Sequence, residues 1–125
     1  MDLRVLSGCH CLAARRRARE ITRIYDGYLR PHGLRATQFS VLAALTFQDA
    51  VPLGRLAEAL GMERTTLTRS TVLLEKKGWI RSDASQDARI RPLRITASGR
   101  RKLEQAFESW KAAQKAARKK QHSKT

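Results

Sequence analysis

The sequence predicts a mainly α-helical fold that carries one small β-hairpin, an α+β arrangement within a single domain. Apolar residues recur at helical spacing along most of the chain, whereas apolar and basic residues alternate only within 79–95. Gly61 and Gly78 each follow a helical segment, at the position where glycine commonly ends a helix. A chain of 125 residues, 42% of them hydrophobic, is long enough for one modest core.

Residues 1–10 carry no firm pattern and are expected to form an N-terminal arm. A helix is predicted over 11–30, because apolar side chains share one stripe of it and arginines cover its other faces. Pro31 and Gly33 end this helix. The stripe should face inward against a packing partner, and it consists of Cys11, Ala14, Ala18, Ile21, Tyr25 and Tyr28.

The central helix of the core is predicted to begin near Ala36 or Thr37. Phe39 and Leu42 lie on one face of it at helical spacing, so this face should be buried. Residues 48–51 are expected to form a loop that leads into the next helix.

Two short helices are predicted next, over 53–60 and about 63–77. In the second of them Leu67, Thr71 and Leu74 form the face that should be buried. Such a pair fits a helix-turn-helix whose second helix enters a major groove, and an ordinary helical hairpin with a solvated polar face is the alternative. The residues expected to meet the major groove and its phosphates are Arg64, Thr65, Thr66, Thr68 and Arg69.

A β-hairpin is predicted over 79–95, where a strand-like run, a polar and turn-rich stretch and an alternating apolar and basic run follow one another. Beside a helix-turn-helix, such a hairpin is a wing. Asp87 lies near its tip, where the carboxylate would orient Arg89 for insertion into a minor groove, with Arg91 nearby. The hairpin therefore favours DNA binding over the ordinary helical hairpin.

A last helix is predicted over 97–120, with Thr96 as its N-cap. At 1.5 Å per residue it reaches roughly 35 Å, longer than one small domain needs. Its apolar stripe consists of Leu103, Ala106, Phe107 and Trp110. The apolar half that one domain leaves exposed should therefore pack on another subunit. Residues 121–125 are expected to form a basic tail.

The order of these elements resembles the MarR family of winged-helix transcriptional regulators, over roughly 9–110. The resemblance rests on an ordered set of short motifs that follow the helix-turn-helix. They are Leu74, Glu75, Lys76, Lys77, Gly78, Trp79 and Ile80, then Asp87, Ala88 and Arg89, then Leu93, Arg94, Ile95, Thr96, Ala97, Ser98 and Gly99.

The resemblance implies a homodimer in which the helices over 11–30 and 97–120 of two chains interlock. The region 36–96 would be the DNA-binding winged helix-turn-helix, and two such regions would bind successive major grooves of double-stranded DNA. A pseudo-palindromic operator with half-sites about 34 to 36 Å apart would follow. The resemblance implies repression of transcription. Repression would be relieved by oxidation of a cysteine or by a small-molecule effector, such as an aromatic acid, in the cleft between the dimer helices and the DNA-binding lobe.

The charge of the chain points to a polyanionic partner. Lys and Arg number 26 against 11 Asp and Glu, a formal net charge of +15, which suits nucleic acid or an anionic membrane surface. No apolar run is long enough to span a bilayer and no export signal is evident, so a cytoplasmic protein without a membrane role is expected. A non-specific architectural protein that coats nucleic acid is the main alternative, because charge alone would drive its binding.

Cys11 is a candidate redox sensor, with Cys9 and Tyr25 as accompanying residues. Its place near the start of the first helix resembles the reactive cysteine of the hydroperoxide-sensing branch of the family. Arg15, one turn further on, and the helix N-terminus would both favour the thiolate. The alternative is that Cys11 is a small buried helix residue with a packing role.

Other uses of the cysteines are less well supported. Cys9, His10 and Cys11 lack the further ligands that zinc needs, so no metal site and no cofactor are expected. A thiol peroxidase that uses Cys11 would need a general base, and the sequence offers only Cys9 as a nearby resolving partner. The chain is therefore not expected to be an enzyme.

Overall fold

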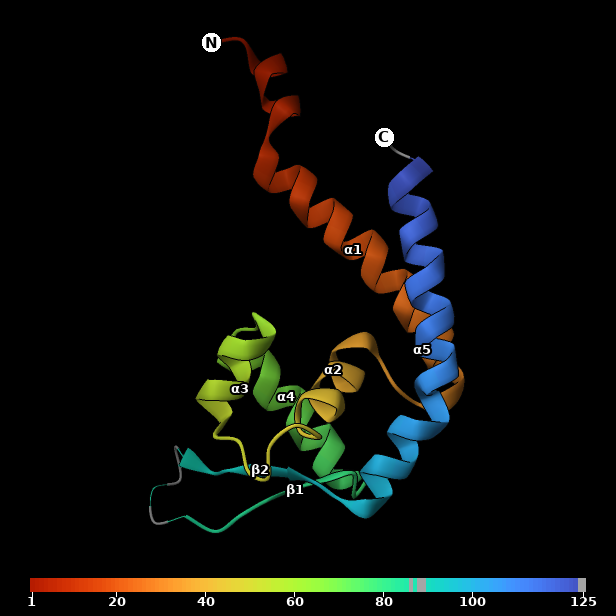
Figure 1. The fold of residues 1–125 in the computed structure, drawn as a ribbon. Helices are drawn as coiled ribbons and strands as arrows, with labels where there is room; N and C mark the ends of the chain where they lie inside the picture. The colour runs from red at the N-terminus through yellow and green to blue at the C-terminus, as the bar shows by residue number, and fades with distance from the viewer. Residues whose placement is uncertain (86, 88–89, 124–125) are drawn as a thin grey trace.

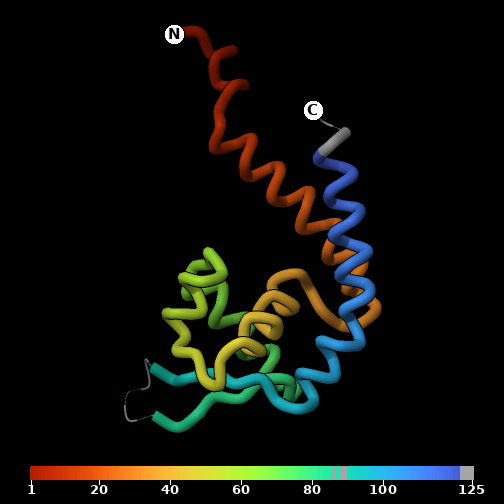
Figure 2. Tube along the Cα trace, in the orientation of Figure 1, coloured from red at the N-terminus to blue at the C-terminus, as the bar shows by residue number. Residues whose placement is uncertain are grey.

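The computed structural model describes residues 1–85, 87 and 90–123 (Figure 1). Two long helices, α1 (His10–Leu29) and α5 (Ala97–Ser123), pack on one another where α1 ends, and they diverge toward the two chain ends. A smaller lobe of helices and the hairpin lies beside the start of α5, as the tube in Figure 2 also shows. The fold is mainly helical with one hairpin, as predicted.

The small lobe is made of α2 (Ala36–Ala44), α3 (Leu53–Leu60), α4 (Arg64–Lys76), β1 (Ile80–Ser82) and β2 (Leu93–Ile95). The helix α2 lies at its centre and contacts α1, α3, α4 and α5, which confirms the prediction of a central core helix. Its buried residues include Phe39, Val41 and Leu42. Further buried side chains from the surrounding elements complete the core, and they include Leu29, Leu45, Leu56, Leu67, Leu74, Ile80 and Leu93.

The predicted helix-turn-helix is present. The helix α3 ends at Gly61, which has a left-handed φ of 62°, and α4 begins at Arg64. Leu67, Thr71 and Leu74 are the buried residues of α4, as the helical spacing predicted. Burial of this one face fixes which side of α4 is turned outward.

The two strands pair antiparallel, with Ile80 opposite Ile95 and Ser82 opposite Leu93. The second strand is shorter than predicted, because it begins only after Pro92, which has no backbone N–H to offer a ladder. Val51, predicted to lie in a loop, forms an isolated bridge to Leu93 instead. Each amide of this pair donates to the carbonyl of the other, at 3.0 and 2.9 Å, so the segment before α3 extends the hairpin by one residue.

The N-terminal region differs from the prediction. A short 3-10 helix, η1 (Leu3–Gly8), stands where no firm pattern was recognised, and all its residues are exposed. Within one chain the predicted inward stripe of α1 is only partly buried, because Ile21 and Tyr25 are half-buried whereas Cys11, Ala14, Ala18 and Tyr28 are exposed. The first half of α1 is uncovered because α5 diverges from α1 toward this end (Figure 1).

The helix α5 continues through Ser123, so residues 121–123, expected in a tail, extend it. No proline or glycine interrupts the chain after Gly99, so nothing in the sequence ends the helix earlier. Ala113 and Ala117 are buried on α5, although alanines gave only a weak apolar signal there. Within the described residues, no helix has an apolar stretch sufficient to cross a membrane.

The junction between the hairpin and α5 is tightly packed. The Thr96 hydroxyl accepts a hydrogen bond from the Gly99 amide at 3.0 Å, which confirms Thr96 as the N-cap. The Thr96 amide donates to the Trp79 carbonyl oxygen at 3.0 Å. A Cβ atom at Gly99 would lie 2.0 Å from that same carbonyl oxygen, so no other residue fits at this position without displacing the backbone.

We expect Gly99→Ala to lower the free energy of unfolding by about 3 kcal/mol, the upper part of the range for overpacking, because the added methyl group meets backbone. Thermal or urea unfolding followed by circular dichroism measures the change. Gly27→Ala is the control, since nothing lies within 4 Å of a Cβ atom there, and it should be neutral or stabilising. Equal stability of Gly99→Ala and the wild type would contradict the packing described.

Candidate nucleic-acid interface

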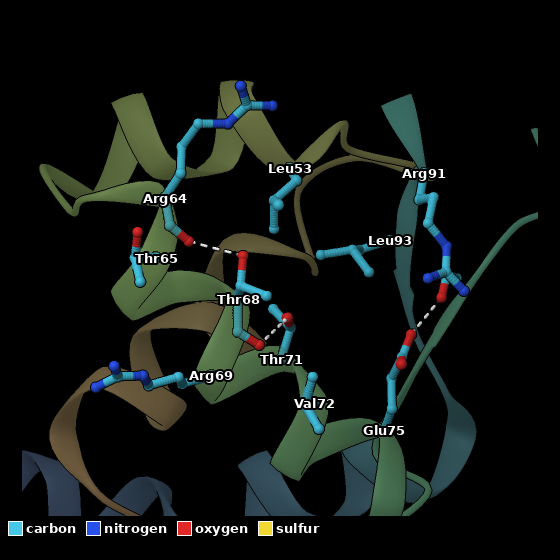
Figure 3. Close-up of a pocket in the computed structure, with 11 residues that line it drawn as sticks. Leu53, Arg64, Thr65, Thr68, Arg69, Thr71, Val72, Glu75, Arg91 and Leu93 are labelled. Carbon is cyan, nitrogen blue, oxygen red and sulfur yellow. Dashed lines mark hydrogen bonds between the residues drawn. The ribbon is translucent and has the colours of Figure 1, made fainter. Parts of the chain in front are cut away.

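A pocket of about 590 Å³ separates the outward face of α4 from the second arm of the hairpin (Figure 3). Five of the residues predicted to contact DNA line it, namely Arg64, Thr65, Thr68, Arg69 and Arg91. The other lining residues were not predicted as site residues, and they are Leu53, Thr71, Val72, Glu75, Ser82 and Leu93. The fold thus brings the polar face of α4 and the wing arginine to one hollow.

The direction of the arginines follows from their places on α4. Figure 3 shows the side chains of Arg64 and Arg69 pointing away from one another, while Arg91 approaches from the other side of the pocket. The Arg64 guanidinium lies over the first turn of α3, where a Cβ atom at Gly54 would be 3.3 Å from its Nη2. The glycine therefore leaves the space that Arg64 occupies, and the three cations are spread over the interface.

The threonines of α4 differ in what they can offer a partner. The Thr68 hydroxyl donates to the Arg64 carbonyl oxygen at 2.8 Å, and the Thr71 hydroxyl donates to the Thr68 carbonyl oxygen at 2.9 Å. Since its proton is used within the helix, Thr68 presents a methyl group and acceptor lone pairs to the outside. Such a group suits a thymine methyl or a base amino group better than a phosphate oxygen.

The base of the wing is held by polar contacts on both sides. The Ser82 hydroxyl, on β1, donates to the Glu75 carboxylate, on α4. The Arg94 Nε lies 2.7 Å from Asp83 Oδ2, and its Nη1 donates to the Asp49 carbonyl oxygen at 3.1 Å. Hydrogen bonding to Asp83 raises the pKa of Arg94, which therefore stays charged.

Two of the described residues that were predicted to contact DNA do not line this pocket. Thr66 is exposed on α4 but does not line the pocket. Asp87 lies in the loop of the hairpin, where its amide donates to the Ser85 hydroxyl at 3.3 Å. Arg89 lies outside the described residues, so the predicted orientation of Arg89 by Asp87 is not tested.

Glu75 is the pocket residue that a sequence signal could have revealed. It follows Arg64, Thr68 and Thr71 at intervals of three or four residues, so all four share one stripe of α4. On α4, only basic and hydroxyl residues of the first turns were predicted to contact DNA. Ser82 carried no comparable signal, because its role depends on how the hairpin packs on α4.

The predicted redox residues are not gathered within one chain. Cys9 is the N-cap residue of α1 and Cys11 is exposed, with Arg15 Nη2 3.4 Å from the Cys11 Sγ. Tyr25 lies 14 residues further along α1, which corresponds to about 21 Å of helix. The Tyr25 hydroxyl donates to the Gln114 side chain on α5.

Tyr25 is a structural contact in this chain rather than a neighbour of the cysteines. Burial raises the pKa of Tyr25, and the positive charge of Arg118 partly opposes this shift. The phenol is therefore protonated at neutral pH and remains a hydrogen-bond donor. No group of three or more potential metal ligands occurs among the residues that the structure describes.

A second pocket, of about 370 Å³, lies between the diverging halves of α1 and α5. Apolar residues such as Ile21 and Ala117 line it together with charged ones such as Arg16, Arg17 and Glu20. The effector cleft expected from the resemblance lay beside the DNA-binding lobe, whereas this pocket lies further along the two long helices. It therefore does not correspond to that cleft.

Comparison with known proteins places the chain in a family. The MarR family model matches residues 34–90. The transcriptional regulator MosR of M. tuberculosis, solved in complex with DNA, is 40% identical; the match covers 85% of this chain and 77% of MosR, with a TM-score of 0.76. AbfR, solved in reduced form bound to DNA, is 26% identical; that match covers 86% of this chain and 78% of AbfR, with a TM-score of 0.74.

A curated relative extends the agreement at the level of sequence. The HTH-type transcriptional regulator SarZ of Staphylococcus epidermidis is 32% identical over 84 residues, which cover 66% of this chain and 57% of SarZ. The chain thus spans a little over half the length of this relative. From its sequence, its helix-turn-helix and its hairpin together, the chain belongs to the MarR family, and its small lobe is a winged helix.

Proposed function

We propose that this chain is a transcriptional regulator that binds double-stranded DNA through α4 and the wing. The observation that carries the proposal is the division of α4 into two faces. Leu67 and Leu74 are completely buried, whereas Arg64 and Arg69 are exposed beside the wing pocket. The solved complexes of MosR and AbfR with DNA support it.

In this mechanism α4 enters a major groove. Arg69 would make a bidentate contact to guanine, and Thr68 would contact a base edge through its methyl group or lone pairs. Arg64, displaced toward α3, would meet a phosphate together with Thr65 and Thr66. Arg89, oriented by Asp87 and with Arg91 nearby, would meet the minor groove or the backbone.

The functional form would be a homodimer built by the long helices. Several apolar residues at the start of the chain are exposed, among them Leu3, Val5, Leu6 and Leu12, and a second copy would cover them. Two α4 helices would then occupy successive major grooves of a pseudo-palindromic operator, with half-sites about 34 to 36 Å apart. A dimer seated on an operator would block transcription, and we propose a repressor.

Release from DNA would follow binding of a small-molecule effector or oxidation of Cys11. The Cys11 thiol is free and exposed, and Arg15 Nη2 lies 3.4 Å from its Sγ. The thiolate would attack a hydroperoxide oxygen, the O–O bond would break, and a sulfenic acid and an alcohol would form. The reduced state of the AbfR complex with DNA is consistent with such control.

A non-specific nucleic-acid-binding protein is the second candidate, and the formal charge of +15 favours it. Both candidates would bind more weakly at high salt, because phosphate contacts release counterions in either case. A strong preference for one DNA sequence would indicate the transcriptional regulator rather than the non-specific protein. A thiol peroxidase would instead reduce peroxide repeatedly in the presence of a thiol reductant.

We expect Arg69→Ala to lower the preference for the duplex upstream of the gene over a scrambled duplex by about tenfold or more, the loss of one bidentate base contact. Fluorescence anisotropy at physiological salt measures both affinities. Arg101→Ala, which removes the same charge from an exposed site on α5, is the control and should preserve the preference. If Arg69→Ala lowers the affinity for both duplexes equally, Arg69 contacts phosphate only.

We expect an organic hydroperoxide to release the wild-type chain from the upstream duplex, and a thiol reductant to restore binding. Cys11→Ser should bind the duplex before and after the peroxide, because it has no thiolate to oxidise. Cys9→Ser is the matched control and should still respond. Binding that is indifferent to peroxide in the wild type would leave Cys11 without a sensing role.

A further inference from the structure

We propose that Glu75 is a positioning residue that holds the wing at a fixed place relative to α4, through the hydroxyl of Ser82. Arg91 is the wing side chain whose position depends on this contact. The proposal rests on the proposed DNA-binding function and adds to it a residue that does not itself read DNA.

The hydrogen bond between Ser82 and Glu75 joins the two parts of the proposed interface, α4 and the wing. The Ser82 hydroxyl donates to the Glu75 carboxylate, and both residues are half-buried and line the pocket. Ser82 is paired with Leu93 in the hairpin register, and Leu93 lies two residues after Arg91. A shift between α4 and β1 would therefore move the arm of the hairpin that carries Arg91.

Several other polar contacts of the hairpin lead elsewhere, although β1 also packs against α4. Arg94 joins Asp83 to the carbonyl oxygen of Asp49, and Leu93 pairs with Val51, so this edge is attached to the segment before α3. The Trp79 carbonyl oxygen is attached to the start of α5. Among the hydrogen bonds of the described residues, the one from Ser82 to Glu75 is the side-chain bond that joins α4 to the strands.

The negative charge of Glu75 is unexpected in a pocket proposed to face DNA. Among the described residues that line the pocket, it is the one carboxylate, beside the positive charges of Arg64, Arg69 and Arg91. A carboxylate facing phosphates is unfavourable, so it is expected only where it has a specific task. It could accept a hydrogen bond from a cytosine amino group, but base contacts come from the N-terminal part of a recognition helix, whereas Glu75 is the last but one residue of α4.

Amide hydrogen exchange without DNA tests the contact directly. In Glu75→Ala and Ser82→Ala we expect the Asp83 amide, which donates to the Pro92 carbonyl oxygen at 2.8 Å, to exchange about tenfold faster, as for the loss of one hydrogen bond to a charged group. The Leu56 and Leu67 amides should keep their protection and serve as internal controls. Unchanged exchange at Asp83 in both variants would overturn the proposal.

Conservative variants separate positioning from a loss of structure in general. Glu75→Gln keeps an acceptor oxygen and Ser82→Thr keeps the hydroxyl, so both should restore slow exchange at Asp83. If the Asp83 amide exchanges as fast in Glu75→Gln as in Glu75→Ala, the charge of Glu75 rather than its hydrogen bond holds the wing, and the proposal is wrong.

A double-mutant cycle tests the consequence for DNA, using the tightest duplex recovered from a random-sequence library. In the wild-type background Arg91→Ala should clearly lower the affinity for this duplex, whereas in the Glu75→Ala background it should hardly change the affinity. The two effects on affinity should differ by about fivefold or more. The matched control is Glu58→Ala, an exposed carboxylate on α3, which should leave the effect of Arg91→Ala unchanged. Additive effects of Glu75→Ala and Arg91→Ala would overturn the proposal.

The two proposals fail in different ways. If the wild type shows no preference for any duplex, the proposed function fails, and the exchange experiment still decides whether Glu75 holds the wing. If the wild type prefers one duplex but Glu75→Ala alters sequence preference at a single base pair, Glu75 reads DNA itself and the positioning role is wrong.

Discussion

The burial of one face of α4 is the constraint on which the rest of the interface depends. Leu67 and Leu74 are completely buried against a core centred on α2, so α4 cannot rotate without exposing them. Because side chains on a helix have fixed relative directions, this packing also fixes Arg69 and its neighbours on the outside. Gly61 makes the turn from α3 that this position requires.

A second constraint joins the wing to the long helices. The Thr96 amide and the close approach of Gly99 hold the start of α5 against the Trp79 carbonyl oxygen. The hairpin base and α5 therefore move together, while α1 contacts α5 along its second half. A chemical change at Cys11 lies at the far end of α1, so its effect would have to travel through the packing of α1 on α5 or through a second copy of the chain.

The sequence predicted those elements whose pattern is local and repeated. Helical spacing with a terminal glycine located α3 and α4, and the hydroxyl of Thr96 located the start of α5. Val51 was missed because a single bridge has no periodicity, and its pairing depends on where the hairpin lies. The exposure of Cys11 was missed because an apolar stripe shows that a partner is needed, not whether the same chain supplies it.

The site was predictable as a face but not as a set of side-chain contacts. Spacing placed Arg64 and Thr68 outward, yet it could not show that Thr68 uses its proton within the helix or that Arg64 leans over Gly54. Both features narrow what α4 offers to bases, so in the proposed function discrimination between sequences would fall largely on Arg69 and on contacts of the wing. An interface with few base contacts depends strongly on the spacing between its parts. A residue such as Glu75, which sets that spacing, can then alter recognition without touching DNA.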